Sequence, residues 1–452
     1  MIASETISVT TKSPAAGKLF EEAMASYEKL QLVGTQEKLK AAIGADPNFA
    51  LAYAFQAYFA TDPALAASSR RRAKSLEPGV THGEQLLIQW ITSQQEGDFI
   101  RAISAMNDML AAYPRDKRMR MYVGEWLFSQ ERYEQSARVL DEALKIDPNY
   151  AAAWNDLGYA YIYEGKVDEA VAALKKSATL LPGEPNPHDS LAEINRLVGH
   201  YDEALSEYRE ALKIQPTFVT SQAGLGDTYA LMGQQQRARE EFAKAIAAAS
   251  SREEALGFRF QSAMTYIHEK DFQNADKGFT QLAEDADKAG LADLESQCYR
   301  AMAMYAKDLN GMLEDINRAN AALRHNHQTA QTLLDAELAQ NLRVRAFREA
   351  EAGNKDGAEA TVKLLAALAE ANRSEIVQRC YHAATGASFM ADGKFIEALP
   401  ELQEDPSNAI SLKWLAVAYE KSGNGAEAKI TRDHMMLIHK NTIEDAIATL
   451  GM

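Results

Sequence analysis

The stretch that decides the fold of this chain is residues 151–184, which read AAAWNDLGYAYIYEGKVDEAVAALKKSATLLPGE. Trp154, Leu157 and Tyr161 are spaced three and four residues apart, so they lie on one stripe of a helix. Near the end of the stretch, Pro182 cannot continue a helix and predicts a change of chain direction. The stretch therefore predicts helical structure with one apolar face, followed by a break.

Small and charged residues within the same stretch predict where a first helix ends and a second begins. Gly165 predicts the end of the first helix, and Asp168 and Glu169 place negative charge where the dipole of a second helix favours it. Gly158 and Ala170 are small where the two helices would cross, and a larger side chain there would cost about 1–3 kcal/mol through overpacking. We therefore expect a hairpin of two helices that cross at Gly158 and Ala170.

The order of these residues resembles the tetratricopeptide repeat (TPR), which is about 34 residues long. The pattern W-x2-L-G-x2-Y is followed by the small residue of the second helix, by Leu174 where the family has Phe, and then by the proline. The resemblance implies hairpins that each bury their apolar face against the next hairpin. It also implies a scaffold that binds protein partners, similar to bacterial TPR proteins that stand alone or are attached to signalling modules.

The same pattern recurs along most of the chain. Four prolines follow one another at intervals of 34 residues, namely Pro114, Pro148, Pro182 and Pro216. The resemblance is strong over residues 83–245 and weak over residues 290–340. Because a single hairpin cannot bury its apolar face alone, we expect an all-α, right-handed α-solenoid of about twelve TPR-like helix-turn-helix hairpins.

The strength of the pattern divides the chain into three parts. Residues 1–15 are polar and read as an N-terminal leader, residues 16–293 as a regular TPR array, and residues 294–452 as a degenerate TPR-like array. A final helix near residues 441–450 is expected to cap this array. We expect a break in superhelical curvature, or a domain boundary, where the register weakens.

Composition restricts the partners and the compartment. The chain has 48 basic and 64 acidic residues, a net charge of −16, which argues against nucleic acid or an anionic membrane as the main partner. No apolar run approaches about 18 residues, so no membrane span is expected. The two cysteines, Cys298 and Cys380, imply no disulfide framework. The first residues lack the features of a signal peptide, so the localisation stays open between the cytoplasm and the mature form of an exported protein.

No motif in the sequence predicts catalysis, a metal or a cofactor. Gly224 and Gly226 form part of a GxGxxG pattern, but Tyr229 stands in place of the third glycine. His325 and His327 do not share a helical face, and no ligand cluster accompanies them. We therefore expect a non-enzymatic chain without metal or cofactor, and an enzyme with an atypical site is the least supported alternative.

The resemblance also indicates which residues would bind a partner, because the first helix of each TPR hairpin lines the concave groove. Carried over to this sequence, the groove positions give the candidate ligand-binding residues Glu125, Asn155, Tyr159, Asp189, Glu193, Arg196, Asp227 and Phe260. TPR domains that bind chaperones hold an acidic peptide with basic residues at these positions. Four of the eight candidates are acidic, so they would repel such a peptide.

The candidate residues predict a groove for a neutral-to-basic peptide or protein segment, with Tyr159 and Phe260 as aromatic anchors. One alternative is that the acidic residues are ordinary solvated surface in a chain of net charge −16. A second alternative is a structural protein that assembles with itself into an oligomer or filament, because the ends of a solenoid are natural stacking surfaces.

Overall fold

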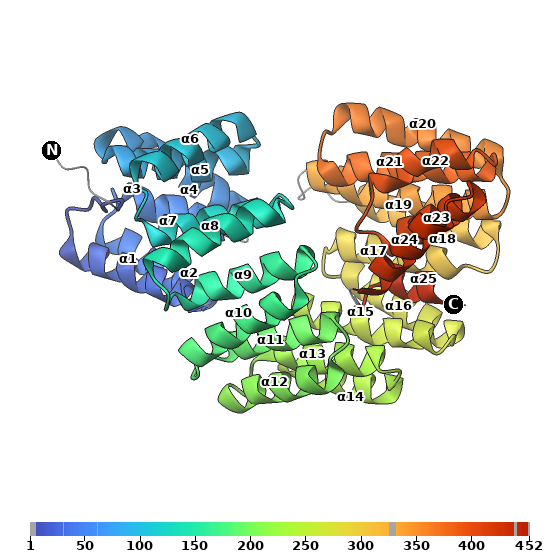
Figure 1. The fold of residues 1–452 in the computed structure, drawn as a ribbon, viewed down its shortest axis with the longest axis horizontal. Coiled ribbons are helices and arrows are strands. Elements are labelled where there is room, and N and C mark those ends of the chain that lie inside the picture. Colours follow the sequence, from blue (N-terminus) through green and yellow to red (C-terminus); the bar gives the residue numbers. More distant parts are fainter. Residues whose placement is uncertain (1–5, 30, 61, 325–330, 438–440, 451–452) are drawn as a thin grey trace. The chain divides into compact units, whose positions relative to one another are not determined.

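The structure is a computed structural model that describes residues 6–29, 31–60, 62–324, 331–437 and 441–450. Within these ranges the chain forms 25 α-helices, one short 3-10 helix and no β-strand (Figure 1). The helices form two compact units, Met1–Ile194 (unit 1) and Asn195–Met452 (unit 2). The expected all-α solenoid is confirmed, since α1 to α24 follow one another as twelve pairs in the described part of the chain.

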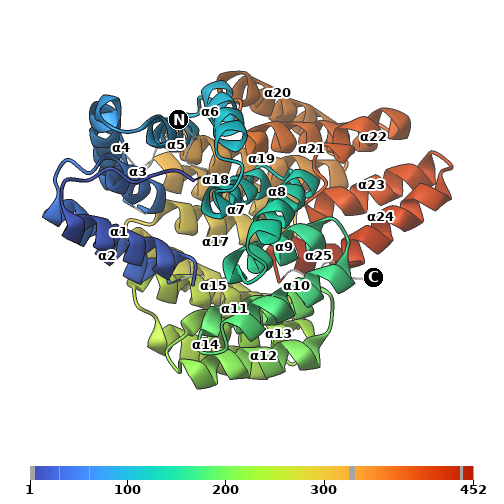
Figure 2. The same ribbon diagram turned by 60° about the vertical axis from the view of Figure 1, so that its left-hand side comes forward.

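Unit 1 contains five complete helix pairs, and the division between the units falls within α11. Figure 2 shows α1 to α11 from a second direction. Its elements are α1 (Pro14–Tyr27), α2 (Leu32–Ala45), α3 (Ala50–Phe59), α4 (Pro63–Leu76), η1 (Glu77–Gly79), α5 (His82–Glu96), α6 (Phe99–Ala112), α7 (Lys117–Ser129), α8 (Tyr133–Ile146), α9 (Ala151–Tyr163), α10 (Val167–Leu180) and α11 (Pro185–Leu197).

The hairpin of α9 and α10 has the predicted turn and crossing. Gly165 has a φ of +77°, a left-handed conformation that glycine adopts without steric cost. Where the two helices cross, a Cβ atom on Gly158 would lie 2.6 Å from Cγ of Leu174 and 3.2 Å from the carbonyl oxygen of Ala170. The helices can approach this closely only because position 158 has no side chain.

A continuous hydrophobic core joins the hairpins of unit 1, from Ala16 in α1 to Ala160 in α9. Aromatic rings fill its first half, where Phe55 of α3 lies 5.7 Å from Phe20 of α1 and 5.2 Å from Tyr122 of α7, measured between ring centroids. The helix α1 therefore packs against α7 as well as against its partner α2.

Unit 2 continues with longer helices. Its elements after α11 are α12 (Tyr201–Ile214), α13 (Val219–Leu231), α14 (Gln235–Ala248), α15 (Arg252–His268), α16 (Phe272–Asp287), α17 (Ala292–Tyr305), α18 (Leu309–Arg324), α19 (Gln331–Glu351), α20 (Lys355–Ala371), α21 (Glu375–Ala391), α22 (Phe395–Gln403), α23 (Ala409–Lys421), α24 (Gly425–Leu437) and α25 (Ile443–Thr449).

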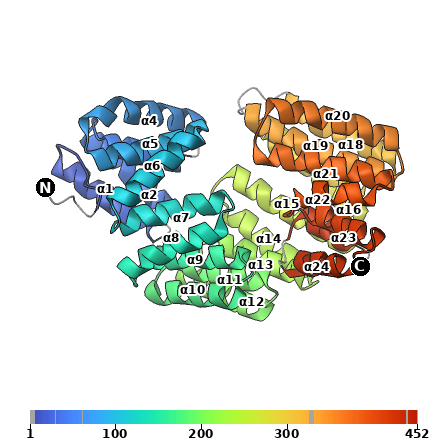
Figure 3. The same cartoon turned by 45° about the horizontal axis from the view of Figure 1, so that its top comes forward.

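The weak register of the second half of the sequence reflects these longer helices. α9, α11 and α13 have 13 residues each, whereas α15 has 17, α19 has 21 and α21 has 17. Longer helices still pair as hairpins, and α18 to α21 lie side by side in unit 2 (Figure 3). They cannot keep a 34-residue period, so the spacing of the prolines is lost although the architecture persists.

The last described helix, α25, contacts α15, α17 and α23. Its Ile443 and Ala446 are buried in the same hydrophobic cluster as Leu256, Met264 and Ile267 of α15. This cluster therefore joins residues that are far apart in the sequence of unit 2.

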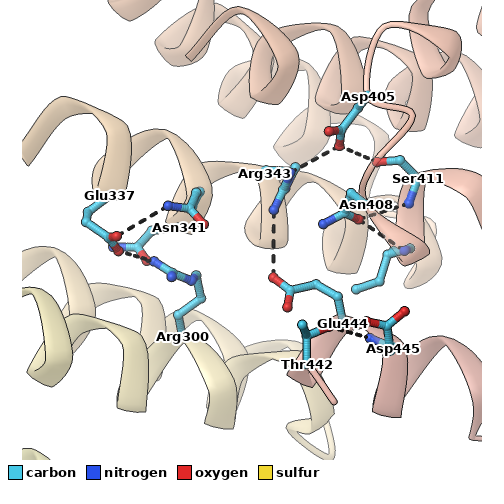
Figure 4. Close-up of polar contacts among 12 residues, drawn as sticks. Arg300, Glu337, Asn341, Arg343, Asp405, Asn408, Ser411, Thr442, Glu444 and Asp445 are labelled. Carbon is cyan, nitrogen blue, oxygen red and sulfur yellow. Dashed lines mark hydrogen bonds and ion pairs between the residues drawn. The ribbon is translucent and has the colours of Figure 1, made fainter. Parts of the chain in front are cut away.

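Buried charges also connect the helices of unit 2 (Figure 4). Arg343 of α19 is 5 % exposed, and its Nη1 donates to Oδ2 of Asp405 at 3.1 Å. The same carboxylate oxygen accepts from the hydroxyl of Ser411 at 2.6 Å, and Nη2 of Arg343 lies 3.8 Å from Glu444 of α25. This network links α19, the turn before α23, and α25.

Candidate functional site

On α7, the candidate groove positions contact α1 of the same chain. The hydroxyl of Tyr27 lies 2.8 Å and 2.7 Å from the two carboxyl oxygens of Glu125, to which it donates its proton. Two helical turns before Glu125 on α7, Nε of Arg118 donates to Glu28 at 2.7 Å and its Nη1 donates to Glu21 at 3.0 Å. In unit 1, α1 therefore lies against the face of α7 where the resemblance to TPR proteins predicts that a ligand binds.

Next to Glu125, α9 contributes a second carboxyl group, Asp156. Burial raises the pKa of Glu125 well above its usual range, and the charge of Asp156 adds to this shift. Burial likewise raises the pKa of Asp156, to about 7. The adjacent candidate, Asn155, is 4 % exposed. Among the described residues, neither Oδ2 of Asp156 nor Oδ1 of Asn155 accepts a hydrogen bond, so this buried polar group is only partly satisfied.

A hydrogen bond joins two further candidates, Tyr159 of α9 and Glu193 of α11. The Tyr159 hydroxyl donates to Oε2 of Glu193 at 2.6 Å, and burial raises the pKa of this tyrosine well above its usual range. The ring of Phe128 packs edge-on against Tyr159, with centroids 6.4 Å apart. Asp189 lies one turn before Glu193 on the same helix and is half-buried.

The three remaining candidates belong to unit 2. Arg196 is buried, and its Nε donates to the hydroxyl of Tyr208 at 3.4 Å. Oδ1 of Asp227 accepts from the side-chain amide of Asn441 at 2.8 Å, just before α25. Phe260 packs against Phe279, with ring centroids 5.1 Å apart.

The structure thus groups the candidates by unit. In unit 1, Glu125 and Asn155 share one buried polar group with Asp156, and Tyr159 is bonded to Glu193. In unit 2, Asp227 lies against the segment that leads into α25.

A segment that the sequence predicts to be a polar leader forms ordered contacts in unit 1. We call Thr6–Lys12 the strap. Its backbone crosses the starts of the first helices of three hairpins, α7, α5 and α3, in that order. The sequence signal that points to it is the alternation of Ile7 and Val9 with Ser8, because both apolar side chains are half-buried on the core and Ser8 is exposed.

Three carboxylates hold the strap. Oδ2 of Asp116 accepts from the backbone N–H of Ile7 at 2.9 Å. Glu84 accepts from the backbone N–H of Thr10 at 2.7 Å and from its hydroxyl at 2.6 Å. Oδ2 of Asp46 accepts from the Thr11 hydroxyl at 2.5 Å and from the backbone N–H of Lys12 at 3.1 Å.

A cavity of about 450 Å³ lies beneath the strap. Its wall is mostly apolar and comes from α1, α3, α5 and α7, with charged residues at the start of α7. The lining residues used below are Ile7, Val9, Phe20, Leu51, Leu87 and Tyr122.

Elsewhere, the described residues give little indication of chemistry. They contain no group of three or more His, Cys, Asp or Glu side chains that could hold a metal ion. None of the described helices is both long and apolar enough to cross a bilayer. Cys298 and Cys380 are buried free thiols. His325 and His327 lie outside the described residues.

Comparison with known proteins supports the repeat assignment. Family models described as tetratricopeptide repeat match residues 94–151, 127–194 and 198–253. Superkiller complex protein 3 of Mus musculus is 29 % identical over 102 residues, 23 % of this chain and 6 % of that protein. TPR repeat-containing protein YpiA of Bacillus subtilis is 23 % identical over 235 residues, which cover 51 % of this chain and 53 % of that protein.

Among solved structures, a tetratricopeptide repeat protein from Parabacteroides merdae is 16 % identical, with a TM-score of 0.38, and the match covers 63 % of this chain and 98 % of that one. The chain spans only 6 % of the mouse relative and about half of the Bacillus relative. The matched residues run from the end of α5 to the start of α15. The chain therefore carries tetratricopeptide repeats over residues 94–194 and 198–253.

Proposed function

We propose that this chain is a non-enzymatic scaffold that holds a neutral-to-basic segment of a protein partner against the inner helices of its repeats. The observation that carries the proposal is the pair of Tyr159 and Glu193, joined at 2.6 Å across two successive inner helices. A carboxylate fixed by a neighbouring hydroxyl keeps its position before a partner arrives, so less side-chain entropy is lost on binding.

The charge and the aromatic character of the candidates favour a basic segment over an acidic one. Asp189 and Glu193 lie one turn apart on α11, and Asp227 lies on α13. Carboxylates attract Lys and Arg side chains and repel acidic tails. Tyr159 and Phe260 are both half-buried, as expected of aromatic residues that anchor an interface.

The face of α7 is the exception, because its candidate residue, Glu125, contacts Tyr27 of α1 in the same chain. In unit 1 we therefore place the partner segment against α9 and α11, where the candidates are Tyr159, Asp189 and Glu193. In unit 2 the acidic candidate is Asp227 of α13.

Neutralising three acidic candidates together tests this proposal. The triple substitution Asp189→Ser, Glu193→Ser and Asp227→Ser should weaken the binding of a partner isolated by affinity capture roughly tenfold or more, because favourable charge pairs are lost. Titration calorimetry with the purified partner measures this change. The loss should be smaller in high salt, which already screens the charges.

A matched variant separates a local effect from a change in net charge. Asp168→Ser, Glu169→Ser and Asp202→Ser remove three exposed carboxylates from the second helices of neighbouring hairpins. This control should bind the partner as the unchanged chain does. Equal affinity of all three proteins would refute the assignment of the surface.

A further inference from the structure

The strap has the features of a bound ligand rather than of a terminal tail. It makes no helix, and its polar backbone groups bond to side chains of three hairpins that lie 34 or more residues further along the chain. Two alternate side chains, Ile7 and Val9, point to the core, while Ser8 between them is exposed. This is how an extended peptide binds to a protein surface, with its backbone recognised by hydrogen bonds and alternate side chains by pockets.

The three acids that hold the strap are built into the repeats. Oδ1 of Asp116 caps α7 by accepting from the N–H of Met119 at 3.0 Å, and Oδ1 of Asp46 accepts from the N–H of Asn48 at 3.0 Å. Each therefore fixes its own turn with one oxygen and offers the other to the strap. Glu84 is fully buried and is part of the capping box of α5.

Among the described residues, the strap fills its site only in part. A cavity of about 450 Å³ remains beside Ile7 and Val9, with a wall that includes Phe20, Leu51 and Leu87. A cavity of this size in an apolar wall forfeits the contacts that larger side chains would make. A segment with the same backbone pattern and larger inward side chains would fit the site better than the resident strap.

We propose that the strap is a resident pseudo-ligand, and that the site formed by Asp46, Glu84, Asp116 and the cavity binds an extended partner segment in its place. The partner segment carries two large apolar side chains at alternate positions, followed by hydroxyl residues and a basic residue. This site shares no residue with the eight candidates of the inner surface, so it goes beyond the proposed function. An experiment that refutes one proposal therefore does not refute the other.

The test uses the full chain and two fluorescent peptides. One peptide has the sequence of residues 6–13, and the other has Phe at the positions that match Ile7 and Val9. In the protein, Thr10→Val and Thr11→Val remove two strap hydroxyls that donate to Glu84 and Asp46, without loss of volume. Ser8→Ala is the control, because the Ser8 side chain is exposed.

The peptides should bind roughly tenfold more tightly to the Thr10→Val, Thr11→Val chain than to the Ser8→Ala chain, because a loosened strap competes less well. The peptide with Phe should bind more tightly than the native sequence. Adding Glu84→Gln to the loosened chain should reduce binding again roughly tenfold, because a carboxylate that accepts two hydrogen bonds is lost. Gln at this position can still complete the capping box.

Hydrogen exchange supplies a direct measure of displacement in the unaltered chain. Saturating the chain with the Phe peptide should expose the amides of Ile7, Thr10 and Lys12 to exchange. The proposal is overturned if the peptide binds while these amides stay protected, or if no variant binds either peptide. Dimers of the loosened chain that form through exchanged N-termini would also overturn it, since the occupant would then be a second copy.

Discussion

At the scale of single residues, the most unusual group is the carboxyl pair of Glu125 and Asp156. Both lie on inner helices of unit 1, and the only hydroxyl bonded to Glu125 in the described residues is that of Tyr27. Tyr58 of α3 is a further neighbour, and burial raises its pKa. Two carboxylates this close and this poorly solvated do not both ionise readily, so the pair tends to hold a proton.

The pair predicts that unit 1 becomes less stable as the pH rises. The folded chain keeps a proton on Asp156 up to about pH 7, whereas an unfolded aspartate releases it near pH 4. Between these values the folded state binds more protons at Asp156, so the contribution of Asp156 to stability is greatest below pH 4, falls as the pH rises through this window and stays lower above it. The fall should be roughly 2 to 4 kcal/mol, because a tenfold change in proton affinity corresponds to about 1.4 kcal/mol.

Urea unfolding followed by circular dichroism at a series of pH values measures this effect. Asp156→Asn should remove the part of the fall that Asp156 contributes and make the chain more stable than the unchanged protein at pH 8, while burial still raises the pKa of Glu125. Asp168→Asn, at an exposed position on α10, should keep the original slope. An unchanged slope in Asp156→Asn would show that Asp156 does not hold the proton.

Residue patterns in the sequence predicted the close packing at a helix crossing, but they did not predict the buried carboxyl pair. Gly158 was expected at a helix crossing, and the structure places it against Leu174. Asp156 follows Asn155 in an ordinary helical stripe, and nothing in that spacing shows that Glu125 approaches it from another hairpin. Contacts between repeats depend on how the hairpins stack, which the period alone does not specify.

At the scale of elements, the turns between hairpins do more than reverse the chain. In the Asp-Pro-Asn turns, Asp46 and Asp147 each accept from the backbone N–H two residues later. Their second oxygens reach further, to the strap from Asp46 and to Lys117 at 2.5 Å from Asp147. Asp405 holds the corresponding place before Pro406 and binds buried Arg343. An acidic residue in a turn can therefore bind an element that is distant in the sequence and hold it against the repeats.

Removing Asp405 should destabilise unit 2 more than most single substitutions. Asp405→Ala leaves the guanidinium of Arg343 buried without its principal partner, which typically costs about 3–5 kcal/mol. Thermal denaturation measures the loss, and the exposed neighbour Glu404→Ala is the control and should change little. The double variant Asp405→Ala, Arg343→Met should recover part of the stability, because it no longer buries an unpaired charge. A cost of Asp405→Ala below about 1 kcal/mol would contradict this role.

The sequence predicted the helix pairs but not where the terminal elements pack. The number of hairpins and the all-α class follow from the period and the turn residues. The packing of α1 against α7, and of the strap against α5 and α7, depends on side chains about 70 to 110 residues apart, such as Thr10 with Glu84 and Ile7 with Asp116. A periodic pattern describes neighbours, so it carries no signal for contacts of this range.

At the scale of the whole molecule, helix contacts are local within each unit. Most of the described helices in contact within a unit stand one or two places apart along the chain. Exceptions are Phe55 of α3 with Tyr122 of α7, and Phe347 of α19 with Trp414 of α23. Arrays of this kind behave approximately as a sum of repeats and nearest-neighbour interfaces. Each unit also has contacts between helices that are far apart in the sequence. In unit 1 these are side-chain contacts of α1 with α7, and in unit 2 they are contacts of α25 with α15 and α17.

A cavity in one hairpin should therefore have a local effect. Leu140→Ala removes a fully buried side chain that packs against Gly124, and should cost about 2–5 kcal/mol. Hydrogen exchange should quicken in α7 to α10 and stay unchanged in α20 to α24, because the disturbance is passed on mainly between neighbours. Val139→Ala, at a half-buried position, should show a smaller change of the same pattern. Equally faster hydrogen exchange along the whole chain would show instead that the chain unfolds as one cooperative unit.

The return of α25 to α15 also has a consequence for biosynthesis. Leu256 and Met264 leave the ribosome long before Ile443 and Ala446 are made, so the growing chain exposes an apolar surface until α25 is synthesised. Translation that stops before α25 would leave this surface exposed, and chaperones or proteases that recognise exposed apolar surface would encounter it. Escape from these factors therefore depends on the synthesis and packing of α25.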